Sequence, residues 1–317
     1  MHRQRSHIAS RINHVATALE RRGIAATYDL HDRALSNRQS RRRFASHHPA
    51  LDDVQRGIVE ALDRDGFVAL PFSDLVGEEL TGAVLEQGSA FVAETESALA
   101  AEASGGSPAA LRRRAGKEFV VRAYSFEGVT LDLAESAWLR VCLSHRLLDV
   151  ANAYLQMWAK LSYVDLWYTA PQPAGSERAA SQLWHRDFDD KHLLKAFLYL
   201  VDVDETAGPF EYVSGSQPGG RYASSWPWAP MTTGRISEDE VSGTVAGDAI
   251  ETFTAPRGTL ILCNTSGLHR GGFATAKPRA LATATYCSAA SLKSLSVRNF
   301  TLAGNGVADP VVQYAVG

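Results

Sequence analysis

The chain has 317 residues, 45% of them hydrophobic, which is enough to bury a substantial core, and one domain with helical additions accounts for this length better than two equal domains. Its formal net charge of −3 gives no general attraction to nucleic acid or to anionic membranes. Three widely spaced cysteines argue against a disulfide scaffold, and the lack of a signal-like or membrane-spanning apolar run predicts a soluble, cytoplasmic protein.

The N-terminal segment, residues 1–48, is rich in arginine and ends near the run Arg41-Arg42-Arg43. Apolar residues recur in its first part at helical spacing, and these are Ile8, Ile12, Val15 and Leu19. The spacing favours a solvated helical extension. A basic arm that binds nucleic acid or a protein partner is the alternative.

Residues 49–303 are expected to form one domain, followed by a C-terminal tail over 304–317. The segments 104–108 and 117–126 are expected to be irregular, the latter close to a substrate. Periodicity and composition predict helices over 51–62, 77–103 and 133–157, and a turn and strand over 65–71.

The core is predicted to begin with a strand at 160–168. Alternation along it places Tyr163, Asp165 and Trp167 on one face. An aspartate and two amphipathic rings suit a polar pocket, so we expect this face to look inward, with Asp165 near a substrate. Simple core packing of Trp167 is the alternative.

Two later segments carry residues expected to contact a substrate. An apolar strand is predicted at 193–203, where Lys195 either meets a carboxylate of a substrate or co-substrate or faces solvent. The regular pattern breaks down over 215–247, and long irregular insertions in compact domains are commonly lids or binding loops. Trp226 and Trp228, held among prolines there, are predicted to help to cover a substrate.

The most informative motif is Trp184-His185-Arg186-Asp187. In a strand, side chains at i and i+2 leave the same face, so His185 and Asp187 can bind one metal ion. The tripeptide alone is weak, but it is answered downstream by His269, which follows a short apolar strand and a polar turn. Two histidines and one carboxylate leave open positions on one side of an ion, as in non-haem Fe(II) oxygenases.

Ten residues after His269 comes Arg279, at the start of a strand-like run. Alternation places Arg279, Leu281, Thr283 and Thr285 on one face of that run. An arginine binds a carboxylate through two parallel hydrogen bonds, which lysine cannot match. The spacing indicates a keto-acid pocket beside the metal, and a surface arginine after a proline is the alternative.

Together, the stretches 182–187, 195–205, 208–210 and 268–272, with Arg279, resemble the phytanoyl-CoA dioxygenase family of Fe(II)/2-oxoglutarate-dependent oxygenases, over roughly residues 50–300. The resemblance implies a mainly β fold, a double-stranded β-helix (jelly-roll, cupin-like) core with flanking helices. It implies further that His185, Asp187 and His269 bind iron and act as the catalytic centre. Residues of the 2-oxoglutarate pocket would be Arg279, Gln182, Thr283 and Trp167.

The reaction that this resemblance implies is O2-dependent hydroxylation of an unactivated C–H bond in a small-molecule metabolite, secondary metabolites included, with release of succinate and CO2. Desaturation, epoxidation or ring formation would use the same ligands. In related halogenases a small residue replaces the carboxylate, so Asp187 favours oxygenation. Two alternatives stay open: a metal-binding jelly-roll that senses or binds without turnover, and a nucleic-acid-modifying oxygenase that uses the basic arm.

Overall fold

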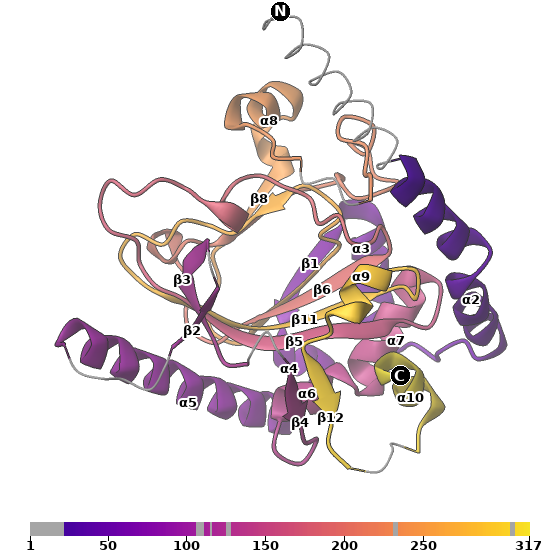
Figure 1. The fold of residues 1–317 in the computed structure, drawn as a ribbon, viewed down its shortest axis with the longest axis horizontal. Coiled ribbons are helices and arrows are strands. Elements are labelled where there is room, and N and C mark those ends of the chain that lie inside the picture. Colours follow the sequence, from indigo (N-terminus) through magenta and orange to yellow (C-terminus); the bar gives the residue numbers. More distant parts are fainter. Residues whose placement is uncertain (1–21, 106–110, 115, 125–127, 231–233, 305–307) are drawn as a thin grey trace, which may run out of the picture.

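The computed structural model describes residues 22–105, 111–114, 116–124, 128–230, 234–304 and 308–317 (Figure 1). Within these residues an antiparallel sheet has the strand order β1-β9-β6-β11-β5-β3-β2, and a second sheet has the order β10-β7-β8. The large sheet consists of β1 (Phe67–Pro71), β9 (Thr259–Cys263), β6 (Leu193–Tyr199), β11 (Arg279–Cys287), β5 (Lys160–Thr169), β3 (Lys117–Arg122) and β2 (Arg112–Arg114). The small sheet consists of β10 (His269–Arg270), β7 (Phe210–Val213) and β8 (Ile250–Phe253), and β12 (Phe300–Leu302) pairs in parallel with β4 (Val129–Leu131).

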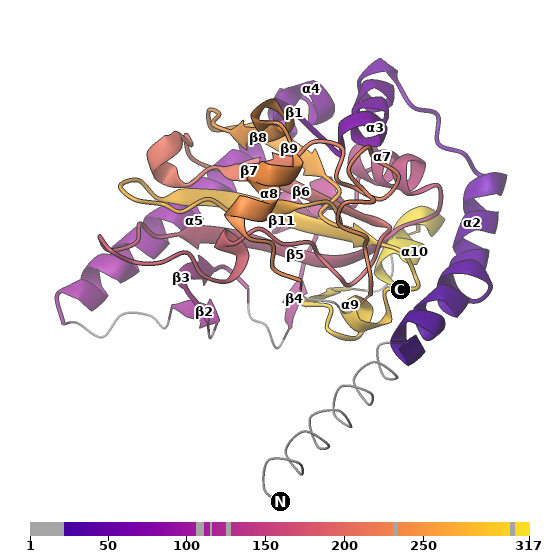
Figure 2. The same ribbon diagram turned by 90° about the horizontal axis from the view of Figure 1, so that it is seen from above.

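Most helices lie on the side of the large sheet away from the small sheet or along one edge, whereas the helix over Glu238–Thr244 lies beside β8 (Figures 1 and 2). Residues 22–33 form the first helix of the described chain. The others are α2 (Ser36–Ser46), α3 (Asp53–Asp65), α4 (Phe72–Val76), α5 (Glu78–Ala103), α6 (Ala137–Cys142), α7 (His145–Leu155), α8 (Glu238–Thr244), α9 (Leu292–Ser296) and α10 (Pro310–Val316). None of the described helices combines the length and the apolar composition that a membrane span needs.

Two apolar cores lie on opposite faces of the large sheet because its strands alternate. On β11, Ala280, Ala282 and Ala284 point into the helix-side core, where Leu62 of α3 and Trp138 of α6 are fully buried. The opposite face meets the small sheet in an inter-sheet core formed by Phe197, Tyr199, Val203, Ala207, Phe210, Tyr212, Phe253, Ile261, Cys263 and Leu281. Burying one such side chain contributes about 1.5–3 kcal/mol, so the two sheets are held face to face.

Several sequence-based predictions are confirmed. The predicted helices at 51–62 and 77–103 are α3 and α5, and the predicted strand near 65–71 is β1. Gly66 ends α3 with a left-handed φ of 84°, a conformation that glycine adopts without steric cost, and turns the chain into β1. The three cysteines, Cys142, Cys263 and Cys287, are free and buried, in keeping with the prediction that they form no disulfide scaffold.

Four predictions of secondary structure were wrong in extent. The single helix predicted over 133–157 is two helices, because Ser136 caps the first turn of α6 and the chain is extended at Ser144, where α7 begins. The strand predicted over 193–203 ends at Tyr199. Residues 117–122 form the regular strand β3. Residues 184–187 make only an isolated bridge at His185 instead of a strand.

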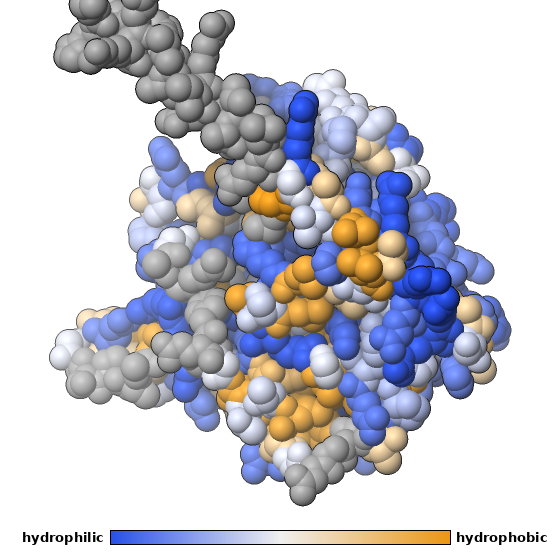
Figure 3. All heavy atoms as spheres, turned by 45° about the vertical axis from the view of Figure 1, so that its right-hand side comes forward, coloured by the Kyte–Doolittle hydropathy of each residue, from blue (hydrophilic) through white to orange (hydrophobic). Residues whose placement is uncertain are grey.

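The structure describes only part of the N-terminal segment but includes the C-terminal helix. The apolar residues from Ile8 to Leu19 lie outside the described residues, whereas 22–33 and α2 are helical and run along one edge of the molecule (Figure 2). The predicted C-terminal tail contains α10, whose Tyr314 carbonyl accepts a hydrogen bond of 2.7 Å from Lys160 Nζ on β5. On the face seen in Figure 3, apolar residues lie in patches separated by hydrophilic ones.

Candidate metal centre

His185 and His269 are brought together by the backbone. The amide of each residue donates to the carbonyl of the other, and both N–O distances are 3.0 Å. His269 belongs to β10 and pairs with Tyr212 of β7, so His185 extends the small sheet by one residue. The amide of Asp187 then donates to the carbonyl of Thr265 over 2.8 Å. The predicted ligands therefore share one site even though no regular strand carries His185 and Asp187.

Both imidazoles are held in the tautomer that a metal ligand needs. Nδ1 of His185 bonds the carbonyl oxygen of Leu183 at 2.8 Å, and Nδ1 of His269 bonds that of Gly267 at 3.0 Å. A carbonyl oxygen only accepts, so each Nδ1 carries the proton and each Nε2 keeps a free lone pair. Burial lowers the pKa of His185, and burial together with the neighbouring His185 lowers the pKa of His269 to about 3. Both rings are therefore neutral at physiological pH.

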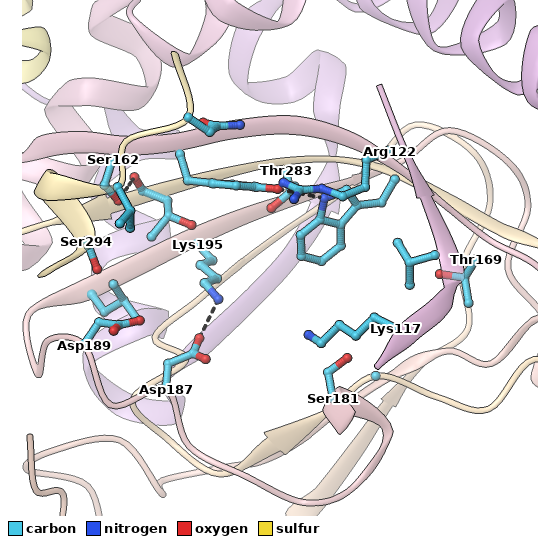
Figure 4. A pocket seen from close by; sticks show the side chains of 18 of the residues that line it. Lys117, Arg122, Ser162, Thr169, Ser181, Asp187, Asp189, Lys195, Thr283 and Ser294 are labelled. Carbon is cyan, nitrogen blue, oxygen red and sulfur yellow. Dashed lines mark hydrogen bonds and ion pairs between the residues drawn. The ribbon is translucent and has the colours of Figure 1, made fainter. Parts of the chain in front are cut away.

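The third candidate ligand is a charged carboxylate. Burial alone would raise the pKa of Asp187, but the Lys195 ammonium holds it well below its usual range. Lys195 Nζ lies 2.5 Å from Oδ2 of Asp187 (Figure 4). The same carboxylate oxygen lies 3.9 Å from Nε2 of His269. One potential ligand atom from each of His185, Asp187 and His269 falls within 4.8 Å of the others, so the three side chains converge on one point.

A cavity of about 670 Å³ opens beside this point, over the face of the large sheet that β5, β6 and β11 form. Asp187, Lys195 and Arg279 all line it. Its volume is in the range of small-molecule sites, about 300–1,000 Å³. Figure 4 shows Lys195 reaching from β6 across this space toward Asp187, with Lys117 and Ser181 on another side.

Arg279 is a buried cation at one end of the cavity. Its side chain sits on β11 opposite Thr169 of β5, and only 8% of the residue is exposed. One terminal amino group donates to the carbonyl of Gly208, while Nε has no hydrogen-bond partner within the described part of the chain. Burial lowers the pKa of Arg279, and no described carboxylate acts on it. A buried guanidinium without a counter-ion is costly unless an anion completes the site.

The other residues predicted for the keto-acid pocket lie in this cavity too. Gln182, Thr283 and Trp167 line it together with Arg279. Gln182 is buried, and its side-chain oxygen accepts from the amide of Ala179, but its Nε2 has no partner among the described residues. The Trp167 indole donates to the hydroxyl of Tyr163 over 3.1 Å. Gln182 and Arg279, each with one side-chain nitrogen that has no partner among the described residues, therefore line the same cavity.

The residues predicted to contact a substrate are placed less uniformly. Lys195 lines the cavity, but Asp165 does not. Asp165 is fully buried and forms an ion pair of 2.5 Å with Arg122. Burial raises the pKa of Asp165 to about 6 against the opposing effect of Arg122.

The two tryptophans of the 215–247 insertion lie behind Asp187. Trp226 is buried, and its indole donates to Glu240 over 3.0 Å. The indole of Trp228 donates to the backbone carbonyl of Asp187, also over 3.0 Å. Both rings line a smaller cavity of about 170 Å³, which Asp187 separates from the larger one.

The sequence analysis did not single out several of the residues that line the cavity. Lys117 and Arg122 enter from β3, in the segment 117–126 that was expected to be irregular and close to a substrate. Asp189 and Lys293 come from the irregular segment after Asp187 and from α9. These segments carry no local signal, because only the tertiary fold brings them to the cavity.

Comparisons with known proteins give matches in structure. No family model matches the sequence, and no curated protein sequence matches it. The non-haem alpha-ketoglutarate-dependent epimerase SnoN from nogalamycin biosynthesis is 15% identical with a TM-score of 0.47, over 74% of this chain and 83% of that chain. EctD from S. alaskensis, with 2-oxoglutarate and 5-hydroxyectoine, is 20% identical with a TM-score of 0.48, over 76% and 79%.

HygX from Streptomyces hygroscopicus, with nickel, 2-oxoglutarate and hygromycin B bound, is 17% identical with a TM-score of 0.43, over 75% of this chain and 87% of that chain. EctD has also been solved with bound Fe.

Proposed function

We propose that this protein is a non-haem Fe(II)/2-oxoglutarate-dependent dioxygenase that oxidises a small molecule. The observation that carries the proposal is a single cavity lined both by Asp187, which converges with His185 and His269, and by the buried Arg279, on which no described carboxylate acts. The ligand set alone, or the buried arginine alone, could serve only to stabilise the fold. Together at one cavity they offer donors for a divalent metal and a cation for a dicarboxylate.

The residues present fit the metal. Two neutral imidazoles with free Nε2 atoms and one ionised carboxylate form an N/O donor set suited to a divalent first-row ion, and they leave one side open. His185, Asp187 and His269 would hold it. Iron with 2-oxoglutarate and O2 would supply the power to oxidise an unactivated C–H bond, with succinate and CO2 as co-products.

The residues present also fit 2-oxoglutarate. Arg279 would bind its distal carboxylate with two parallel hydrogen bonds, because Nε and one terminal nitrogen are not used by Gly208. Gln182 would donate its unpaired Nε2 hydrogen, and Thr283 and Trp167 would form the walls. Lys195 would keep the Asp187 carboxylate oriented and lie beside the substrate, and Trp228 would brace the backbone of Asp187 from behind.

The fold supports the same proposal at a coarser level. Two antiparallel sheets face each other with the site between them, as a double-stranded β-helix requires. We assign residues 49–303 to that domain, with 215–247 as its insertion, 1–48 as an N-terminal extension and 304–317 as a C-terminal extension. Hydroxylation is the simplest outcome, because Asp187 supplies a carboxylate where related halogenases have a small residue.

An anaerobic titration with Fe(II) and 2-oxoglutarate tests the proposal. We expect the weak visible charge-transfer band of the iron chelate in the wild type and no band in Asp187→Ala. Arg279→Met should require at least tenfold more 2-oxoglutarate, because a charge-assisted pair of hydrogen bonds contributes about 1.5–3 kcal/mol. Arg257→Met, which removes an arginine remote from the cavity, should behave like the wild type. A wild type that develops no band would contradict the proposal.

Substrate identity needs a second assay. Succinate release in the presence of a panel of small metabolites, with Asp187→Ala as the inactive control, would identify the substrate. Retained turnover in that variant would overturn the ligand assignment.

The alternative functions are less well supported by the described residues. A binding or sensing module would need the histidines but not a buried Arg279. For a nucleic-acid-modifying enzyme the basic run should be available, yet Arg41 pairs with buried Asp32 over 2.7 Å and Arg43 lies 5.3 Å above the ring of Trp158. Salt-dependent binding to oligonucleotides that is lost when residues before Phe44 are deleted would revive this alternative.

A further inference from the structure

The carboxylate ligand sits in a segment that the sheets do not hold. Between the bridge at His185 and the start of β6 at Leu193 the chain has no helix or strand. Two hydrogen bonds fix the backbone of Asp187. Its amide donates to the carbonyl of Thr265, and its carbonyl accepts from the indole of Trp228. Other contacts must therefore determine the path of residues 187–192 and the position of the carboxylate.

Those contacts come from the first helix and meet a buried acid, Asp190, three residues after the ligand. Asp190 is fully buried. One of its oxygens accepts from the hydroxyl of Tyr28 over 2.5 Å, and the other accepts from the amide of Ser288 over 2.7 Å. The Tyr28 hydroxyl also accepts from the amide of Lys191 over 3.2 Å. Tyr28 thus touches both the side chain and the backbone of the segment that follows Asp187.

An acid on the same helix as Tyr28, Asp32, holds the next residues. Asp32, 2% exposed, lies 2.6 Å from Nζ of Lys191 and 3.0 Å from Nε2 of His192. Asn37 and Arg41 complete its shell at 2.9 and 2.7 Å. A buried carboxylate is tolerated only when it is paired and hydrogen-bonded, so docking of this helix and ordering of the segment depend on each other.

The helix also reaches the ligand by a shorter route. The ring of Tyr28 packs on the ring of Trp228 with centroids 5.1 Å apart, and Trp228 donates to the carbonyl of Asp187. One side chain, that of Trp228, thus lies between Tyr28 and the backbone of Asp187. Tyr28 therefore acts on the segment 187–192 at both of its ends.

We infer that residues 22–33 form a clamp on the metal centre, in which Tyr28 and Asp32 are positioning residues for Asp187. The inference rests on the proposed function in taking Asp187 as a ligand. It assigns a role to the N-terminal extension within the site itself. Outer contacts that orient metal ligands typically change metal affinity by 10–100-fold when they are removed.

Two variants of the full-length chain test the clamp: Tyr28→Phe, which removes one hydroxyl and keeps the ring, and Asp32→Asn, which removes one charge. The matched controls are Tyr168→Phe, whose hydroxyl bonds Glu96 on the helix-covered side, and Asp149→Asn near α10. One readout is hydrogen exchange of the amides of 187–192 in the metal-free protein. The other is titration with Co(II), followed by its visible spectrum.

We expect faster exchange over 187–192 and at least tenfold weaker Co(II) binding with an altered spectrum in both clamp variants, and wild-type behaviour in both controls. Unchanged exchange would overturn the clamp whether or not the protein binds metal. Faster exchange with unchanged Co(II) affinity and spectrum would overturn the positioning role. A wild type that binds no Co(II) would instead count against the proposed function, and exchange would still decide whether the helix holds the segment.

Discussion

At the scale of single residues, the protonation of the candidate ligands is set by the backbone around them. Leu183 and Gly267 each precede a histidine by two residues, and their carbonyl oxygens fix the ring proton on Nδ1. The Nε2 atoms face the Asp187 carboxylate without protons between them. Because burial opposes protonation of both rings, the centre is ready to bind a cation at neutral pH.

The arginine end of the cavity depends on a glycine. A Cβ atom placed on Gly271 would lie 3.2 Å from a terminal nitrogen of Arg279, closer than side-chain carbons normally approach. We expect Gly271→Val to displace the guanidinium and to weaken 2-oxoglutarate binding about tenfold, or about 1.4 kcal/mol, while leaving Co(II) affinity unchanged. Titration of the chelate band measures the first effect. Gly57→Val, at a position with no neighbour within 4 Å of the added Cβ, is the control; equal 2-oxoglutarate affinities in the two variants would contradict the prediction.

At the scale of elements, local signals at helix ends determine where the outer layer begins. Asp52 accepts from the amide of Gln55, and the Gln55 side chain accepts in return from the amide of Asp52, which is a complete capping box. Gln55 also donates to the carbonyls of His145 and Arg146, so the start of α3 is joined to α7. The cap therefore contributes to local structure and to the packing of two helices.

Removal of this cap should have a measurable cost. Asp52→Ala leaves first-turn amides of α3 without their partner, and we expect the free energy of unfolding to fall by about 1 kcal/mol. Asp53→Ala removes the adjacent acid, whose side chain is 97% exposed, and should change stability by less than about 0.5 kcal/mol. Urea denaturation measures both. Equal effects in the two variants would show that the capping box is not what stabilises this end.

A histidine links α7 to α10 in a pH-dependent way. His145 contacts Asp309 through Nε2 at 2.8 Å and Asp149 through Nδ1 at 3.1 Å, and these two hydrogen bonds raise its pKa above the usual 6.5. A pKa that is raised in the folded state stabilises the protein fully below 6.5 and ceases to do so as the pH rises through the raised value. We expect Tm to fall across that interval in the wild type and to fall less in His145→Asn. Parallel profiles for the two proteins would count against this linkage.

At the scale of the whole molecule, the large sheet is a partition between two cores of different character. Its helix-side face is packed with aliphatic residues, such as Leu198 and Leu262, that are fully buried. Its other face is apolar only where the small sheet covers it, and beyond that it opens into the cavity that holds Lys195 and Arg279. The helix-side core thus supports a sheet whose inner face can tolerate charged groups.

This division predicts where stability resides. Leu198→Ala should lower the free energy of unfolding by about 2–5 kcal/mol, because a fully buried leucine leaves a cavity in a rigid layer. Val297→Ala, at a residue that is 65% exposed, should change it by less than about 0.5 kcal/mol. Chemical denaturation of both variants provides the comparison, and a small effect at Leu198 would contradict a rigid helix-side core.

Sequence alone predicted those features that follow from local periodicity and from side-chain chemistry. Alternation along the strand predicted which residues of β11 share a face, and turn and helix signals predicted α3, β1 and α5. The donor types of His185, Asp187 and His269 predicted a candidate metal site. Each of these depends on neighbours a few residues apart. For the same reason the sequence indicated Arg279 as a candidate for binding a carboxylate.

Only the tertiary structure decided the remainder, because it depends on contacts between distant segments. The backbone pairing of His185 with His269, the ion pair of Asp165 with Arg122 and the docking of Tyr28 on Asp190 join residues that are 43 to 162 positions apart. No periodicity records such contacts, since they arise when burial leaves each polar group to find whatever partner the fold provides. The sequence therefore determined which groups could bind a metal and a keto acid, and the fold determined which of them meet.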